Sequence, residues 1–311
     1  MIRINEEKCI GCGACAKDCT RQIIKIKNHK AQMEDDSCNL CGHCYCVCPV
    51  EAIEYRAEDL GMPEEPPEIR TDRMQAYLTR HIGGSEEISM AEGRLDPDQL
   101  LRGIKSRRSV RHFKREEVEC KKLKRIVEAA RFVPSGANRQ STEFLIIKEQ
   151  LPEITRECLS IMGNAAREYL KQEVKTADPE RVDFQLKVPG NDCIGGNLVR
   201  DYAEKWIEME QMYRKEGTDR LFYHAAALVV FIGDDLIDAA LAASASELMA
   251  NAEGLGCVYI GFCRFVMNTP KMRKRLGIPD NKEEICCLAL GYPDVQYKRT
   301  APRRTRGMRW M

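Results

Sequence analysis

The chain has 311 residues, which allows about two domains at roughly 150 residues each and a full hydrophobic core. Its 49 Lys and Arg residues balance 48 Asp and Glu residues, so the net charge of +1 creates no overall field that attracts nucleic acid or an anionic membrane. The longest strongly apolar run, residues 225–232, is well short of the roughly 20 residues that span a bilayer, and residues 1–7 lack the apolar region of a signal peptide. We therefore expect a soluble, cytoplasmic protein that binds neither nucleic acid nor membranes.

Cysteine is concentrated near the N-terminus, where nine of the 16 cysteines fall within the first 48 residues. In a chain without an export signal, such thiols serve metals more often than disulfides. Two runs, residues 9–19 and 38–48, repeat the spacing C-x2-C-x2-C-x3-C at an offset of 29 residues. Self-similarity at a fixed offset indicates a duplicated unit.

This spacing is that of a pair of bacterial-type iron-sulfur clusters, in which the fourth cysteine of each run binds the cluster of the other run. Three thiolates from one tight loop reach three corners of a cubane, and Gly11, Gly13 and Gly42 allow close approach of the backbone. We predict that cluster one is bound by Cys9, Cys12, Cys15 and Cys48. Cluster two is then bound by Cys38, Cys41, Cys44 and Cys19.

Residues 1–57 thus resemble a bacterial two-cluster 4Fe-4S ferredoxin domain. Thr20 departs from the family, which has a proline there like Pro49 of the second run. Structural zinc is the alternative, but zinc sites use two separated cysteine pairs and not a duplicated run of three. Cys46, a ninth thiol inside the second run, is interpreted as a small buried apolar residue.

Residues 58–96 are predicted to form a linker, because residues 58–68 carry five acidic residues and three prolines without an apolar period. From residue 97 onward, helical and strand patterns alternate, which favours helices covering a central sheet. Helices are expected at about 97–105 after Asp96 as N-cap, at 116–132 and at 236–253, and strands at 144–147, 228–232 and 286–290. The polar helical stretch 197–217 is interpreted as a lid or a dimer-wrapping element.

Several common sites are excluded. Residues 254–261 superficially resemble a dinucleotide-binding glycine loop, but they follow a predicted helix and precede a strand, the reverse of the required order. Phosphate-binding-loop, zinc-protease and serine-hydrolase motifs do not occur. The cysteines outside the two runs show no ligand spacing and are expected to be reduced core residues: Cys120, Cys158, Cys193, Cys257, Cys263, Cys286 and Cys287.

Four segments remain: residues 107–113 with three arginines, the polar turn 134–140, the strand end 259–262, and residues 290–293 before a basic tail. Taken singly, each fits an ordinary helix end, a turn or a solvated or nucleic-acid-contacting arm. Together and in this order, the elements R-R-S-x-R, P-S-G-x-N-x-Q and G-Y-P resemble the nitroreductase-like FMN-dependent family. The resemblance covers residues 97–311.

The two resemblances imply an α+β chain, in which a bacterial ferredoxin-like domain is followed by a three-layer α/β/α FMN-binding domain that dimerises with FMN at the interface. Arg107, Arg108 and Ser109 would bind the FMN phosphate, since guanidinium groups suit a phosphate. Arg111 would lie near the pyrimidine edge and stabilise negative charge on the reduced ring, and it is the only candidate for tuning the flavin. The other implied FMN contacts are Pro134, Ser135, Gly136, Asn138, Gln140, Tyr259, Ile260, Gly261 and Arg303, with Arg304 or Arg299 as alternatives to Arg303.

One departure concerns the substrate. The family usually has Pro-Trp after the position of Gln140, where this chain has Ser141 and Thr142, so packing beneath the flavin differs. The resemblance therefore leaves the natural acceptor open within a class of nitroaromatics, quinones and enones.

The combination implies an oxidoreductase, because two one-electron clusters can fill a two-electron flavin. The expected donor is reduced ferredoxin or flavodoxin in the cytoplasm of an anaerobe, with NAD(P)H as the alternative. The expected acceptor is a small conjugated organic molecule. A second hypothesis is an electron-transfer or redox-sensing flavoprotein without a small-molecule substrate of its own.

Overall fold

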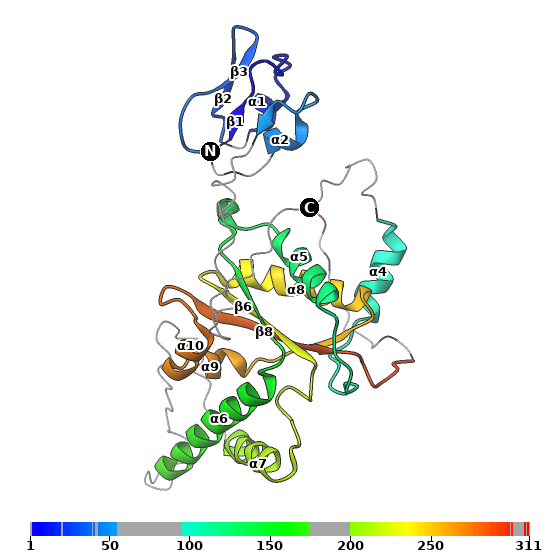
Figure 1. The fold of residues 1–311 in the computed structure, drawn as a ribbon, viewed down its shortest axis with the longest axis vertical. Helices are drawn as coiled ribbons and strands as arrows, with labels where there is room; N and C mark the ends of the chain where they lie inside the picture. Colours follow the sequence, from blue (N-terminus) through cyan, green and yellow to red (C-terminus); the bar gives the residue numbers. More distant parts are fainter. Residues whose placement is uncertain are drawn as a thin grey trace. The chain divides into compact units, whose positions relative to one another are not determined.

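The computed structural model describes residues 2–19, 21–38, 40, 43–54, 95–173, 200–298, 300, 308 and 310 (Figure 1). The chain divides into two compact units. The N-terminal unit comprises Met1–Glu86 and Pro134–Ser141, and the C-terminal unit comprises Glu87–Val133 and Thr142–Met311. Of the predicted linker 58–96, only residues 95 and 96 are described, so the domain bounds 1–57 and 97–311 stay a prediction.

Two small antiparallel sheets and two short helices form the N-terminal unit. β1 (Arg3–Ile4) pairs with β4 (Ile53–Glu54), and β2 (Ile24–Lys27) pairs with β3 (Lys30–Met33). Asn28 and His29 join β2 to β3 at φ of 50° and 59°, which is the geometry of a two-residue hairpin turn. The helices α1 (Ala14–Asp18) and α2 (His43–Val47) each begin inside a cysteine run. The small core contains Ile2, Cys9, Cys15, Ile23, Ile24, Ala31, Cys44, Ala52 and Ile53.

A four-stranded antiparallel sheet with the order β5-β6-β8-β7 lies at the centre of the C-terminal unit. Its strands are β5 (Glu143–Ile147), β6 (Ala227–Gly233), β7 (Gly256–Tyr259) and β8 (Glu283–Gly291). Every residue of β6 is buried, as expected for a central strand covered on both faces.

Helices cover both faces of this sheet (Figure 1). On one side α5 (Cys120–Arg131) packs on α8 (Leu236–Ala252), and α4 (Pro97–Ser106) contacts α8. The other side carries α6 (Leu151–Glu173), α7 (Arg200–Glu216), α9 (Cys263–Met267) and α10 (Pro270–Leu276). The predicted three-layer α/β/α architecture is therefore confirmed. None of the helices in the described part of the chain is both long and apolar enough to cross a membrane.

The helices agree with the sequence pattern except at one end. The carboxylate of Asp96 accepts the backbone N–H of Gln99 at 2.7 Å, which is the predicted N-cap of α4. The helix predicted from residue 116 begins at Cys120 instead. The preceding segment instead runs beside the residues that follow β8, where the N–H of Lys114 donates to the carbonyl of Tyr292. Helix α7 occupies the predicted polar stretch and packs against α6, and residues 197–199 lie outside the described residues.

Two predictions about single cysteines are wrong. Cys46 is exposed, because α2 turns Cys44 into the core and a residue two positions further points to the opposite side of a helix. Cys120 is exposed at the first turn of α5, where Leu123 faces the core. The other described cysteines of the C-terminal unit are buried or half-buried as predicted, and Cys193 lies outside the described residues.

Glu284 in β8 is a fully buried carboxyl group. Neither of its carboxyl oxygens has a hydrogen-bond partner among the described residues. Its backbone is held on both sides by Asn268, which accepts the N–H of Glu284 and donates to its carbonyl, both at 2.8 Å. Burial raises the pKa of Glu284 to about 8, so the side chain is neutral at pH 7.

We predict that Glu284 makes the C-terminal unit less stable at higher pH. Because its folded pKa of about 8 lies above the ordinary value of 4.5, the folded chain keeps a proton that the unfolded chain loses. Stability is thus full below about pH 4.5 and falls by up to roughly 1.4 kcal/mol per pH unit as the pH rises to about 8. Glu284→Gln should flatten this slope in urea unfolding between about pH 5 and 8. Glu117→Gln, which changes an exposed carboxylate, is the control, and an unchanged slope in Glu284→Gln contradicts the prediction.

Candidate functional site

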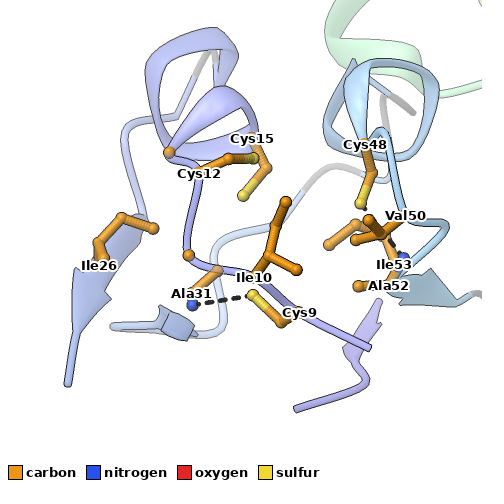
Figure 2. A pocket seen from close by; sticks show the side chains of 12 residues that line it. Cys9, Ile10, Cys12, Cys15, Ile26, Ala31, Cys48, Val50, Ala52 and Ile53 are labelled. Carbon is orange, nitrogen blue, oxygen red and sulfur yellow. Dashed lines mark hydrogen bonds between the residues drawn. The ribbon is translucent and has the colours of Figure 1, made fainter. Parts of the chain in front are cut away.

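A small cavity in the N-terminal unit is lined by cysteines from both runs. Cys9, Cys12, Cys15 and Cys48, the four predicted ligands of cluster one, all contribute to its wall (Figure 2). The other lining residues are Ile10, Gly11, Gly13, Ile26, Ala31, Val50, Ala52 and Ile53, most of which are apolar. Thiols that lie more than 30 residues apart in sequence therefore converge, as cross-ligation between the runs requires.

Backbone N–H groups point at two of these sulfur atoms. The N–H of Ala31 donates to Cys9 Sγ at 3.4 Å, and the N–H of Ala52 donates to Cys48 Sγ at 3.2 Å (Figure 2). Hydrogen bonds to the sulfur ligands tune the electron affinity of a bound cluster. Burial raises the pKa of the Cys15 thiol, so the free thiolate is disfavoured there. Coordination to iron would offset this effect, because a metal-bound thiol is deprotonated.

Two glycines shape the loop of the first run. Gly11 has φ of 67°, and a Cβ built there would lie 2.2 Å from the carbonyl oxygen of His29. Gly13 has φ of 79° at the N-cap of α1, but the nearest atom to its Cβ position is 3.9 Å away on Ile26. Gly11 is therefore needed for a close backbone approach, whereas Gly13 is needed for its backbone conformation alone.

The donor set of this cavity, four thiols from two cysteine runs, is that of a 4Fe-4S cluster. Among the residues that the structure describes, no three His, Cys, Asp or Glu side chains are arranged to hold one metal ion. A 4Fe-4S cluster spreads its thiolates further apart than a single ion does, because iron and sulfide lie between them. The cysteine-lined cavity fits such a cluster.

The second set of ligands is described in part. Cys44 is buried on α2, and Cys19 and Cys38 pack against the same core. Cys41, Gly42 and Thr20 lie outside the described residues. The ligands of cluster two therefore stay a prediction.

We predict that Gly11→Ala blocks binding of one cluster. The new Cβ would clash with the backbone of His29, and the positive φ adds about 1 kcal/mol of strain. Iron per chain should fall from about eight to about four or fewer. Gly13→Ala carries similar strain without the clash and should keep most of its iron. Equal iron in both variants would contradict the close-approach argument.

In the C-terminal unit, residues 107–113 leave α4 and run beside β7. Ser109 forms a parallel bridge with Cys257, and the N–H of Val110 donates to the carbonyl of Cys257 at 3.0 Å. A Cβ at Gly256 would come within 2.5 Å of a methyl group of Val110. This glycine lets the arginine-rich segment lie directly against the strand that leads to Tyr259.

The same segment also contacts the residues that follow β8. Phe113 forms an antiparallel bridge with Pro293, and the carbonyl of His112 accepts the N–H of Asp294 at 2.8 Å. Three of the four segments singled out in the sequence are thus brought together in one unit.

Arg107 is paired with a buried carboxylate. Its Nη1 donates to Oε1 of Glu247 on α8 at 3.0 Å, and Glu247 is only 5% exposed. Burial raises the pKa of Glu247, and Arg107 opposes this shift. Both residues line a cavity of about 100 Å³ together with Arg108 and Tyr297. The positive charge of Arg107 is therefore partly compensated by Glu247. Arg108 forms no ion pair with a carboxylate among the described residues.

The sequence analysis missed Glu247, although a signal for it exists. Ala243, Ala250 and Glu247 share one face of α8 at helical spacing, and all three are buried. A charged residue on a buried, alanine-rich face needs a partner of opposite charge. Arg107 is that partner.

Arg111 lies over an aromatic ring. Its guanidinium carbon is 5.8 Å from the centre of the Tyr223 ring. Tyr223 and His224 have φ of 57° and 56°, in a turn whose N–H groups at Leu221, Phe222 and His224 bond to the carboxylate of Asp219. Strained non-glycine residues held this firmly are typical of functional sites, and no pattern in the sequence pointed to Tyr223.

The predicted ring-face segment follows β7 directly. Tyr259 is 38% exposed. Its partial burial raises the pKa of its hydroxyl group. Ile260 is buried and donates its N–H to the carbonyl of Cys287, while the Cβ position of Gly261 meets no atom within 4 Å. Trp206 of α7 lies edge-on to Phe262, with ring centres 5.4 Å apart.

The fourth segment, Pro134–Ser141, belongs to the N-terminal unit. Ala137, Asn138 and Gln140 have φ of 51°, 56° and 48°, so the loop is strained at three non-glycine residues. The Ser135 hydroxyl accepts the N–H of Gln140 at 2.9 Å, and the side-chain amide of Asn138 donates to the carbonyl of Leu40 at 2.8 Å. In the basic tail, Arg299, Arg303 and Arg304 lie outside the described residues, so their roles stay predictions.

Two family models match the chain. Residues 104–292, more than half of the chain, match the model of the nitroreductase family. The chain therefore belongs to the nitroreductase family, whose members are oxidoreductases. Residues 2–55 match the model of a 4Fe-4S dicluster domain. The expected pairing of a two-cluster domain with a nitroreductase-family domain is confirmed.

Two curated proteins resemble different parts of the chain. A 4-nitrobenzoate reductase from Nocardioides is 25% identical over 210 residues, which cover 64% of this chain and 81% of that protein. One component of an ion-translocating oxidoreductase complex from Methanosarcina acetivorans is 39% identical over 51 residues, but the match spans only 19% of that protein. Among solved structures, an FMN-bound nitroreductase from Bacteroides fragilis is 22% identical with a TM-score of 0.48, and the match covers 68% of this chain and 98% of that one.

Proposed function

We propose that this protein is an iron-sulfur flavoprotein that reduces a small conjugated organic acceptor, such as a nitroaromatic, a quinone or an enone. The observation that carries the proposal is the cavity lined by Cys9, Cys12, Cys15 and Cys48 in a chain of the nitroreductase family. When bound, two 4Fe-4S clusters supply single electrons and FMN supplies a two-electron hydride transfer.

The N-terminal unit holds the clusters through its two cysteine runs. Three cysteines of each run, with the fourth cysteine of the other, make the two ligand sets given above. The N–H groups of Ala31 and Ala52 donate to the sulfurs of Cys9 and Cys48 and would stabilise the negative charge of a bound cluster. The apolar lining of the cavity keeps water from the bound group.

The C-terminal unit provides the phosphate and ring contacts for FMN. Arg107, Arg108 and Ser109 bind the phosphate at the cavity beside α8, and Arg303 of the tail closes on it. The exposed end of Arg111, ordered over Tyr223, provides a fixed positive charge for the pyrimidine edge of the ring. Tyr259, Ile260 and Gly261 line the ring face, and the open space at Gly261 leaves room for a flat ring.

Two copies of the chain complete the FMN site. The strained loop with Pro134, Ser135, Gly136, Asn138 and Gln140 comes from the partner subunit and bonds to the ribityl chain and ring. The exposed apolar side chains of α4 support such a homodimer. No residue of α4 is buried, and its apolar side chains Leu100, Leu101 and Ile104 are 44%, 46% and 42% exposed, an arrangement that a second subunit would cover.

Reduced ferredoxin or flavodoxin in an anaerobe's cytoplasm is the proposed electron donor. The glycine-rich residues 254–261 follow α8 and contain β7, so a helix precedes the strand, which is the reverse of the order that binds a dinucleotide. NAD(P)H remains the alternative donor, because it can stack over a flavin without a sequence motif.

Anaerobic purification followed by reductive titration tests this function. We expect about eight irons and one FMN per chain, and bleaching of the flavin absorbance as the clusters are reduced. Reduced ferredoxin should reduce the flavin faster than NADH or NADPH does. Zinc in place of iron would contradict the electron-transfer function, and clusters without flavin would contradict FMN binding. Rapid reduction by NAD(P)H alone would contradict the proposed donor.

A second candidate function is electron transfer or redox sensing without a small-molecule substrate. The contact between Trp206 and Phe262 favours it, because α7 then lies against the segment that would line the flavin face. Steady-state assays with nitroaromatics, quinones and enones separate the two functions. Turnover of any acceptor class supports the enzyme, whereas a flavin that reduces fully but passes electrons only to a protein supports the carrier.

We predict different effects for the two neighbouring arginines. Arg108→Met should weaken FMN binding about tenfold to hundredfold and leave stability unchanged, because it removes only a phosphate contact. Arg107→Met should also lower the free energy of unfolding by about 1–3 kcal/mol, because Glu247 is left buried without its partner. Adding Glu247→Gln to Arg107→Met should restore stability but not FMN affinity. Flavin fluorescence and urea unfolding measure the two effects, and equal destabilisation by both single variants would contradict the assignment.

A further inference from the structure

Three consecutive residues of the β2–β3 hairpin contact the loop of the first cysteine run. The carbonyl of His29 lies against Gly11, and the N–H of Ala31 bonds to Cys9 Sγ at 3.4 Å. Between them, the side chain of Lys30 reaches back to the same loop. The hairpin therefore contacts the backbone and the thiol of the first ligand of cluster one.

Lys30 is anchored to backbone carbonyl groups. Its Nζ donates to the carbonyl of Cys9 at 2.6 Å and to the carbonyl of Glu6 at 2.7 Å. Both acceptors are uncharged, so these bonds fix the position of the ammonium group without neutralising its charge. The positive charge is held at the residue that bears the sulfur ligand.

Two other lysines of this unit form ion pairs with carboxylates. Lys8 pairs with Glu54 at 4.0 Å, and Lys27 pairs with Glu34 at 3.2 Å. No carboxylate in the described part of the chain forms an ion pair with Lys30. The charge of Lys30 is thus both fixed and uncompensated, and it lies on the partly buried side of the hairpin.

We propose that Lys30 is a positioning residue for cluster one that raises the reduction potential of this cluster. The proposal rests on the binding of cluster one by Cys9, Cys12, Cys15 and Cys48. A cluster held by four thiolates is negatively charged and becomes more so when it gains an electron, so a nearby fixed cation favours the reduced form. The charge also widens the range of donors that can reduce cluster one.

Potentiometric titration of the whole protein, followed by electron paramagnetic resonance of the reduced clusters, tests the role of Lys30. Lys30→Met removes the charge but keeps the length of the side chain. We expect at least a tenfold fall in the ratio of reduced to oxidised cluster one at a fixed potential, which equals a shift of about 59 mV for one electron. Lys30→Arg keeps the charge and should stay close to wild type.

Lys25→Met is the matched control, since Lys25 is an exposed lysine of β2 in the same hairpin, and its side chain forms no hydrogen bond with the described cysteines. It should leave both midpoint potentials unchanged. A Lys30→Met protein with full iron content and unmoved potentials would overturn the proposal, as would an equal shift in Lys25→Met. Lys30→Gln is a second neutral variant, and loss of iron from both neutral variants would overturn the proposal by making Lys30 a structural residue only. If the wild-type protein has no 4Fe-4S signal, the proposed function itself fails.

Discussion

The approach of the first cysteine loop to the β2–β3 hairpin is the constraint on which the N-terminal unit depends. Gly11 lies so close to the carbonyl of His29 that no side chain fits between the two backbones. Because the two backbones are so close, the N–H of Ala31 reaches the sulfur of Cys9, and the ammonium group of Lys30 reaches the carbonyl of Cys9. A core of this size cannot by itself secure such a loop, so the bound group and the hairpin stabilise one another.

Buried charge organises the C-terminal unit in two different ways. Glu247 accepts a hydrogen bond from Arg107, and the pair ties α8 to the start of the arginine-rich segment. Glu284 has no partner among the described residues, and burial leaves it protonated at neutral pH. The pair of Arg107 and Glu247 positions the phosphate-binding residues of the proposed site. The buried Glu284 lowers stability, and it lies far in sequence from the arginine-rich segment.

The residues around the proposed flavin site are held by the backbone more than by side chains. Ser109 and Phe113 form backbone bridges with Cys257 and Pro293, so the backbone is held on both sides of Arg111. Arg111 is then ordered over Tyr223, which lies in a turn closed by Asp219. This rigidity suits a fixed charge that must stabilise a reduced ring without moving.

The sequence alone was sufficient for the ligand spacing, the two-part organisation, the layers of the larger domain and the N-cap of α4. These features follow from local rules, namely the reach of a short loop, hydrophobic period and capping. Only the tertiary structure decided that Cys46 and Cys120 are exposed, because the rotation of the short helix α2 and the residue at which α5 begins both depend on packing. The same holds for Glu247, Tyr223 and Lys30, whose partners lie elsewhere in the chain. Charge pairs and ring contacts between distant residues are set by the packing of whole elements, and no short stretch of sequence carries that information.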